Sequence, residues 1–320
     1  MLPTTEVDEK ITQLIGLLKQ RLEPDGQNLS CFLEGLYHSR YPTYWEYLQL
    51  ELLLNLQHPR TSIPDELVFI TYHQITELYF KLILAEIGQV TAREDIDAAF
   101  FAERIGRVNR YLQNLVYSFD IMAGGMDREQ FQAFRTALSP ASGFQSYQFR
   151  VIEIISTGLA NLRELRYRNE TQGGPEAADL YDQIYWKQGA TVTDTGKKDM
   201  SLILFERQYD PALRQRAADL RSSNLEAQLS RIACDDPGYE HLRASLRTMD
   251  QLVNIDWRLS HFRSAARHLS AQNGDLKATG STNWRQYLPP RFQKLMFFPA
   301  LWSAEERAEW GRSYVEALFQ

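Results

Sequence analysis

The stretch FITYHQITELYFK, residues 69–81, lies in the middle of a long apolar pattern that runs from residue 65 to residue 92. Positions three or four apart share one face of a helix, so this pattern predicts a single long amphipathic helix. His73 lies on that helix between Phe69 and Glu77, with Phe80 further along. An imidazole framed by aromatic side chains and one carboxylate is either a buried base or ligand, or a core histidine that Glu77 satisfies. The residues of this stretch leave both interpretations open.

Helical periodicity recurs along the rest of the chain. We expect further helical segments at residues 4–22, 44–57, 98–122, 146–169, 224–233, 238–269 and 303–319. The last of these opens with a capping box formed by Ser303 and Glu306. Residues 171–200 contain Gly-Gly-Pro and Asp-Thr-Gly, so an irregular segment with one short helix is expected there. Only ATVTDT, residues 190–195, is a weak strand candidate, and the predicted fold class is all-α.

Composition narrows the class of protein. The chain has 320 residues, 44% of them hydrophobic, which is enough to bury a sizeable core. Its formal charge is −6 and its basic residues are dispersed, so no nucleic-acid partner is expected. No signal-peptide pattern and no apolar run of about 18 residues occurs, so no membrane association is expected. Cys31 and Cys234 lie far apart without CxxC spacing, and we expect a cytoplasmic protein.

A second histidine belongs to the segment DWRLSHFRSAARHL, residues 256–269. On a helix, Trp257, His261, Ala265 and His268 fall along one stripe. The small side chains of Ser264 and Ala265 would let a flat macrocycle approach His261 closely, which makes His261 a candidate axial haem ligand. The alternative is a histidine that makes an ordinary hydrogen bond in the core or at the surface, which is the commoner case.

A cation follows two aromatic residues in the segment FQAFRTALSPASGFQSYQFR, residues 131–150. Arg135 comes directly after Phe134 and shortly before a Ser-Pro break. A guanidinium at a helix end can hold a carboxylate through two parallel hydrogen bonds. The alternative is an arginine that lies across the surface of its own helix.

Five blocks of the chain, in the same order, resemble the tryptophan 2,3-dioxygenase family of haem enzymes. They are TYWEYLQLELLLNLQ (43–57), DELVFITYHQITELYFKLILAEI (65–87), FQAFRTALSPASGFQSYQFRVIE (131–153), WRLSHFRSAARHL (257–269) and TGSTNWRQYL…FFPALW (279–302). The resemblance implies a helical haem domain at residues 43–320, with an irregular insertion at about 171–200. Residues 1–42 then form an N-terminal helix and loop extension.

The resemblance also implies roles for single residues. His261 matches the proximal histidine that ligates the iron of haem b, and His73 matches the distal histidine, which faces the indole N–H of the substrate. Arg135 matches the arginine that pairs with the substrate carboxylate, and Thr279 matches a threonine near the substrate ammonium group. The matched pocket-lining positions are Phe69, Phe131, Leu138, Ser142 and Gly143. The positions that a neighbouring subunit contributes to the pocket of this homotetrameric family are Tyr44, Tyr47 and Leu48.

The resemblance therefore implies a haem-dependent dioxygenase that inserts dioxygen across the indole 2,3 bond of L-tryptophan to give N-formylkynurenine. One block departs from the family pattern, because the family carries a glycine-rich GTGGSSG loop where this chain has NGDLKATGSTNWRQYL, residues 273–288. Replaced glycines restrict the backbone and add side-chain bulk. The departure motivates an alternative, a related haem oxygenase of a biosynthetic pathway that acts on a substituted tryptophan, including as a monooxygenase. A binding protein that keeps the pocket without the oxygenase chemistry is a third hypothesis.

Overall fold

The computed structural model describes residues 9–38, 43–168, 177–191, 195–270 and 288–311. Within these ranges the chain forms helices and two isolated bridges but no strand, which confirms the predicted all-α class. It divides into two compact units, residues 1–57 and 58–320. The predicted domain boundary between residues 42 and 43 stays a prediction. No helix in the described ranges is long and apolar enough to cross a membrane.

The first unit contains short helices. They are α1 (Glu9–Leu22), η1 (Glu23–Asp25), α2 (Leu29–His38), α3 (Tyr44–Tyr47) and α4 (Leu50–Leu53). The sequence predicted one helix over residues 44–57, and this is wrong in one respect. Gln49 adopts the left-handed conformation, with φ of 51°, and this residue separates α3 from α4.

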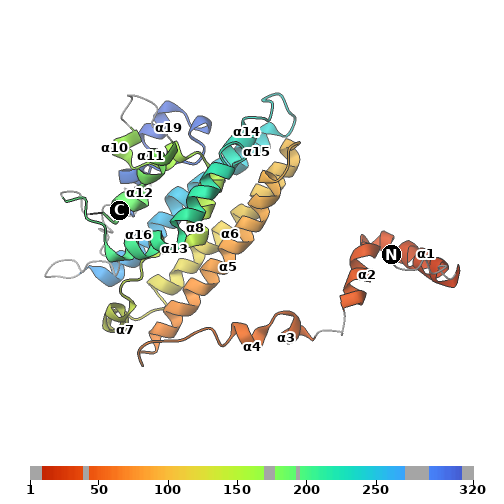
Figure 1. Cartoon of the computed structure of the whole chain (residues 1–320), viewed down its shortest axis with the longest axis horizontal. Helices are drawn as coiled ribbons and strands as arrows, with labels where there is room; N and C mark the ends of the chain where they lie inside the picture. Colours follow the sequence, from red (N-terminus) through yellow and green to blue (C-terminus); the bar gives the residue numbers. More distant parts are fainter. Residues whose placement is uncertain (1–8, 39–42, 169–176, 192–194, 271–287, 312–320) are drawn as a thin grey trace. The chain divides into compact units, whose positions relative to one another are not determined.

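The second unit is a bundle built around two long helices, α5 (Asp65–Thr91) and α6 (Ala98–Ala123), which pack against each other (Figure 1). Asp97 begins α6 by accepting a 2.7 Å hydrogen bond from the backbone N–H of Phe100. The remaining helices of this unit are α7 (Arg128–Phe134), η2 (Arg135–Leu138), η3 (Gly143–Gln145), α8 (Tyr147–Ser156), α9 (Leu159–Leu162), α10 (Leu165–Arg168), α11 (Ala177–Asp182), α12 (Tyr185–Gly189), α13 (Met200–Asp219), α14 (Leu225–Leu229), α15 (Tyr239–Gln251), the π-helix η4 (Leu252–Trp257), α16 (Arg258–Leu269), α18 (Pro290–Gln293), η5 (Pro299–Leu301) and α19 (Ala304–Ala308).

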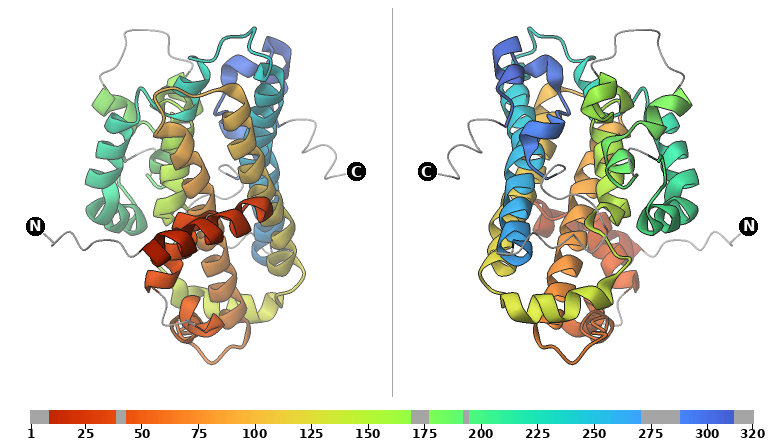
Figure 2. Two further views of the ribbon diagram at one scale, coloured as in Figure 1. Left: turned by 90° about the vertical axis from the view of Figure 1, so that its right-hand side faces the viewer. Right: turned by 90° about the vertical axis from the view of Figure 1, so that its left-hand side faces the viewer.

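The core of this unit lies where α8 covers α5 and α15 covers α6, and Figure 2 shows the aligned helices from two sides. Ile83 and Ile87 of α5 and Ile105 of α6 are fully buried there. A second, smaller cluster gathers aromatic and sulfur-containing side chains around Phe131. Its buried members are Tyr72, Phe119, Met122, Met126, Phe131, Phe134 and Leu269.

Three local features differ from the sequence-based expectation. The helix predicted over residues 146–169 breaks into α8, α9 and α10, because Thr157 and Arg163 both adopt extended conformations. α13 was not predicted, and it continues through Pro211. The helix predicted over residues 238–269 is present but contains the π-helix η4, which shifts the register just before α16. The capping box of Ser303 and Glu306 is confirmed at the start of α19.

Candidate active site

His73 and His261 line the same cavity, which has a volume of about 300 Å³ in the second unit. His73 comes from α5 and His261 from α16, so helices far apart in sequence supply the two imidazoles. Phe69, Phe131 and Gly143 also contribute to the wall. A pocket of this size, with many aromatic side chains and a few polar ones in its wall, is typical of a small-molecule or cofactor site.

The His73 ring has a defined orientation. Its Nδ1 lies 2.7 Å from the backbone carbonyl oxygen of Phe69. A carbonyl oxygen only accepts hydrogen bonds, so Nδ1 carries the proton and Nε2 of the neutral ring is an acceptor. The Phe69 ring packs over the imidazole, with ring centroids 4.1 Å apart. Burial lowers the pKa of His73, against the raising effects of the hydrogen bond to Phe69 and the charge of Glu77.

The His261 ring is half-buried and has no hydrogen-bond partner among the described residues. Burial lowers its pKa to about 4, and the charges of His73 and Arg258 act in the same direction. The imidazole is therefore neutral near pH 7, and a nitrogen lone pair is available to a metal. The Phe119 ring lies nearly parallel to it at a centroid distance of 5.6 Å. A Cβ added to Gly143 would lie 3.5 Å from His261 Cε1, so this backbone passes close to the ring.

The residues around His261 fit haem. Ser264 and Ala265 line the cavity one helical turn after His261, and their small side chains leave room for a flat ring system beside the imidazole. Ten of the 27 residues that line the cavity are Phe, Tyr or Trp, and His261 would offer an iron a single neutral imidazole, a donor set that haem proteins use. The described residues contain no cluster of three or more carboxylate, histidine or cysteine side chains that would hold a bare metal ion instead.

The other predicted site residues lie in several places. Ser142 lines the cavity beside Gly143. Arg135 and Leu138 lie on η2, directly after α7, and the described cavity wall does not include them. Thr279 lies outside the described residues. The three positions predicted to serve a neighbouring subunit, Tyr44, Tyr47 and Leu48, are exposed on the first unit.

Several cavity residues were not predicted from the sequence. Arg150 on α8, Tyr185 on α12 and Arg258 on α16 reach the wall from three segments. Trp186 and Gly189 also line it, so α12, in the predicted irregular region 171–200, forms part of the cavity. The helical pattern around Arg150 and Arg258 was visible, but two arginines on helices usually indicate exposed faces. No local signal in the sequence connects Tyr185 to them.

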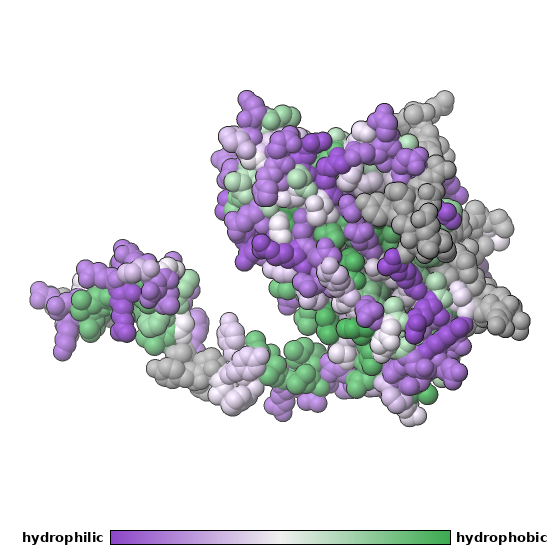
Figure 3. Space-filling model, turned by 180° about the vertical axis from the view of Figure 1, so that it is seen from behind, coloured by the Kyte–Doolittle hydropathy of each residue, from purple (hydrophilic) through white to green (hydrophobic). Residues whose placement is uncertain are grey.

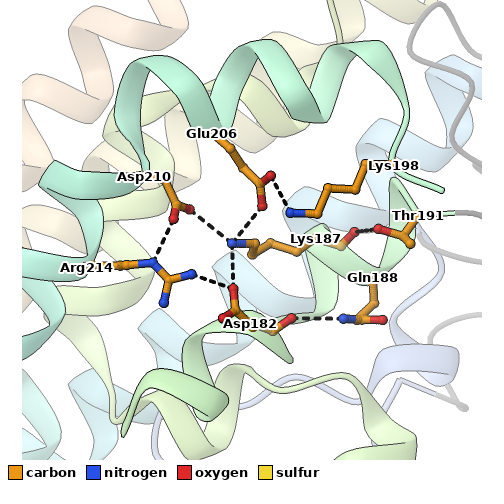
Figure 4. A network of polar contacts seen from close by, with 8 residues as sticks. All are labelled: Asp182, Lys187, Gln188, Thr191, Lys198, Glu206, Asp210 and Arg214. Carbon is orange, nitrogen blue, oxygen red and sulfur yellow. Dashed lines mark hydrogen bonds and ion pairs between the residues drawn. The ribbon is translucent and has the colours of Figure 1, made fainter. Parts of the chain in front are cut away.

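Lys187 anchors α12 through a network of ion pairs with neighbouring segments (Figure 4). Its ammonium group is buried and lies 3.1 Å from Asp182, 2.8 Å from Glu206 and 3.0 Å from Asp210. Arg214 bonds Asp182 and Asp210, and Lys198 pairs with Glu206. The network joins α12 to α11 and α13, and it fixes a helix of only five residues that could not hold its own conformation.

Comparison with known proteins bears on the identity of this cavity. The model of the family described as tryptophan 2,3-dioxygenase matches residues 37–222, which is more than half of the chain. A tryptophan 2,3-dioxygenase of Caulobacter vibrioides is 31% identical over 280 residues, covering 82% of this chain and 96% of the relative. Those of Polaromonas sp. and Bacillus thuringiensis subsp. konkukian are 29% and 28% identical and cover 82% and 88% of this chain, and 87% and 99% of their own lengths. With two histidines of the expected motifs facing one cavity, the chain is a member of the tryptophan 2,3-dioxygenase family, and thus an oxidoreductase.

Proposed function

We propose that the protein is a haem-dependent dioxygenase that converts L-tryptophan to N-formylkynurenine by inserting dioxygen across the indole 2,3 bond. The observation that carries the proposal is the presence of His73 and His261 on opposite helices of one aromatic cavity. His261 would hold the haem iron on one side. Bound haem supplies the activation of dioxygen.

The chain's own residues would position the indole. Phe69 and Phe131 offer apolar aromatic surface to the indole, with their ring planes inclined at 37° and their centroids 6.2 Å apart. His73 Nε2 is the acceptor side of its ring and would take the hydrogen bond of the indole N–H. Many of the side chains that line the cavity are apolar, so the indole would meet largely apolar groups around that contact.

The amino-acid end of the substrate requires charged and polar partners. Arg135 follows Phe131 by one turn of α7 and η2, and we propose that it pairs with the substrate carboxylate. Leu138 and Ser142 follow in the same segment and are proposed to complete the pocket, and Thr279 is proposed to bind the ammonium group.

A cytoplasmic homotetramer is part of the same proposal. Fourteen of the large apolar side chains exposed on the described chain belong to the first unit, and Figure 3 shows green, hydrophobic atoms at the surface. Tyr44 is 71% exposed and Tyr47 76% exposed. Such an apolar surface is typical of an interface with another subunit, and we propose that Tyr44, Tyr47 and Leu48 reach the pocket of a neighbouring copy.

The decisive experiment is mass spectrometry of the product that the ferrous, haem-loaded protein forms from L-tryptophan under labelled dioxygen. Two labelled oxygen atoms in an opened ring are expected. One labelled atom, or turnover of a ring-substituted tryptophan alone, would replace the proposal with the alternative that the glycine-poor sequence at residues 274–283 favours. Haem binding without turnover of any indole would leave a binding protein.

A further inference from the structure

Two buried arginines lie in the cavity wall beside the proposed haem site. Arg150 is 3% exposed and Arg258 is 8% exposed, and both line the cavity. They come from α8 and α16, and the Tyr185 hydroxyl on α12 joins them. Arg150 Nη1 donates to that oxygen at 3.2 Å and Arg258 Nη2 donates to it at 2.8 Å.

This cluster carries more positive than negative charge. Its one carboxylate, Glu153, accepts a 2.6 Å hydrogen bond from Tyr185 and lies 3.0 Å from Arg150 and 3.7 Å from Arg258. Arginine stays protonated in proteins, so two cations face one anion. Arg168 lies near Arg258 and Arg163. Burial lowers the pKa of Arg168 to about 10, and the positive charges of Arg258 and Arg163 act in the same direction. The region around the cluster is therefore cationic.

Both guanidinium groups keep unused donors. The Nε of Arg150 and the Nε of Arg258 are buried without a hydrogen-bond partner. Each arginine uses one Nη for Tyr185 and Glu153, and its other Nη has no partner among the described residues. Glu77 is the remaining carboxylate on the wall, but it bonds Gln148 and lies more than 4 Å from both guanidinium groups. Buried cations with spare donors are costly unless an anion completes them.

We propose that Arg150 and Arg258 form a second carboxylate-binding subsite in the cavity, separate from Arg135. The proposal rests on the proposed function for its two carboxylate sources, which are a propionate of haem and the carboxylate of the amino-acid substrate. The geometry favours the propionate, because Arg258 precedes His261 by three residues on α16 and so lies about 4.5 Å along the helix axis on the same side. An arginine at that position would be within reach of a carboxylate carried by a macrocycle that His261 holds.

The test compares haem with its dimethyl ester, which lacks both negative charges. The full-length apoprotein is titrated with each compound, and the affinity is read from the haem absorbance. The wild type is expected to bind haem about tenfold or more tightly than the ester, as one charge-assisted contact allows. Arg150→Gln and Arg258→Gln should each weaken haem about tenfold and leave the ester within about twofold of the wild type.

Arg163→Gln is the matched control. Arg163 belongs to the same cationic region, bonds Gln183 at 2.7 Å and does not line the cavity. This variant should change neither affinity. Because the comparison of haem with its ester in the wild type needs no substitution, the proposal stays testable even if one arginine variant fails to fold.

A second titration distinguishes the two carboxylate sources. In the haem-loaded protein, L-tryptophan is compared with L-tryptophanamide, which has no carboxylate. If the wild type binds haem and its ester equally, but Arg150→Gln weakens L-tryptophan alone, the substrate carboxylate occupies the subsite. The subsite is refuted if the protein binds haem as tightly as its ester and L-tryptophan as tightly as its amide. It is also refuted if an arginine variant weakens the binding of both members of a pair equally. Failure of the proposed function looks different, since L-tryptophan would then give no product while the preference for haem over its ester remained.

Discussion

Replacing Lys187 with methionine removes a buried cation that three carboxylates surround. The Lys187 side chain is 4% exposed, and its partners Asp182, Glu206 and Asp210 are 54%, 15% and 18% exposed. Loss of one partner from a fully buried ion pair costs about 3–5 kcal/mol. Because Asp182 is half-exposed and Arg214 still bonds Asp182 and Asp210, we expect the lower end, about 3 kcal/mol.

The matched control is Lys198→Met. Lys198 is 47% exposed and contacts Glu206 alone in this network, at 2.6 Å, so its removal should cost about 1 kcal/mol or less. Urea unfolding followed by far-UV circular dichroism measures both variants. Equal losses would refute the reasoning that the buried cation with three partners contributes more to stability than the exposed cation with one. Only Lys187→Met should also weaken haem binding, because α12 lines the cavity.

The pH dependence of this stability follows from the shifted pKa values. Burial acts to lower the pKa of Lys187, but hydrogen bonds to Glu206 and Asp210 outweigh it and leave that pKa raised. Its contribution is therefore complete below the unfolded value and is lost only as the pH rises through the higher folded pKa. Burial acts to raise the pKa of Asp210, but Arg214 and Lys187 leave it lowered. That contribution is present above the unfolded pKa and is lost in acid, so the deficit of Lys187→Met should shrink both in strong acid and in strong base.

Three further predictions concern the site and its support. Arg135→Gln should raise KM for L-tryptophan about 10-fold to 100-fold, since a charge-assisted hydrogen bond to the carboxylate is lost. The Kd of L-tryptophanamide, which has no carboxylate, should not change. Equal effects on both ligands would show that Arg135 does not bind the carboxylate. His261→Ala should weaken haem binding by more than about 100-fold, because loss of a group that only hydrogen-bonds to a metal ligand already weakens metal binding about 10–100-fold. Added imidazole should restore the spectrum of histidine-ligated haem. An unaltered spectrum without imidazole would exclude His261 as the ligand. Burial raises the pKa of Asp250 to about 6, against its hydrogen bonds to Phe297, Asn254, Trp302 and Phe298. In the unfolded chain the carboxyl has the lower pKa and releases its proton first as the pH rises, so the free energy of unfolding should fall by about 3 kcal/mol between pH 4 and 6. Asp250→Asn should abolish this pH dependence when the free energy of unfolding is measured across the same range.

The long helices could be predicted because their periodicity is local. α5 and α6 follow apolar patterns of more than 20 residues, and each begins within a residue or two of its predicted start. α13 could not be predicted in the same way, because Pro211 interrupts its pattern and normally ends a helix. The break at Gln49 was equally hidden, since a left-handed residue is expected at glycine or asparagine and not at glutamine.

In the candidate site, too, some residues could be predicted from local sequence patterns and others could not. His73 and His261 each lie in a stretch whose face could be read from the sequence, and the structure brings both to one cavity. The Arg150–Tyr185–Arg258 cluster could not be found that way, because its members come from three segments and contact one another only after the bundle forms. Long-range contacts between charged side chains leave no periodic trace in a single sequence.

α12 is a part of the site that no local sequence pattern predicted. The helix has five residues, too few to be stable alone, yet Tyr185, Trp186 and Gly189 all face the cavity. Its position therefore depends on polar contacts at both of its sides: Lys187 to the carboxylates of α11 and α13, and Tyr185 to Glu153 and Arg258. Arg258 lies on the helix that carries His261. A change at Lys187 can accordingly reach α16, the helix that carries His261, through the contact of Tyr185 with Arg258. The segment at residues 177–191 is thus part of the site, although its sequence has none of the motifs of a site.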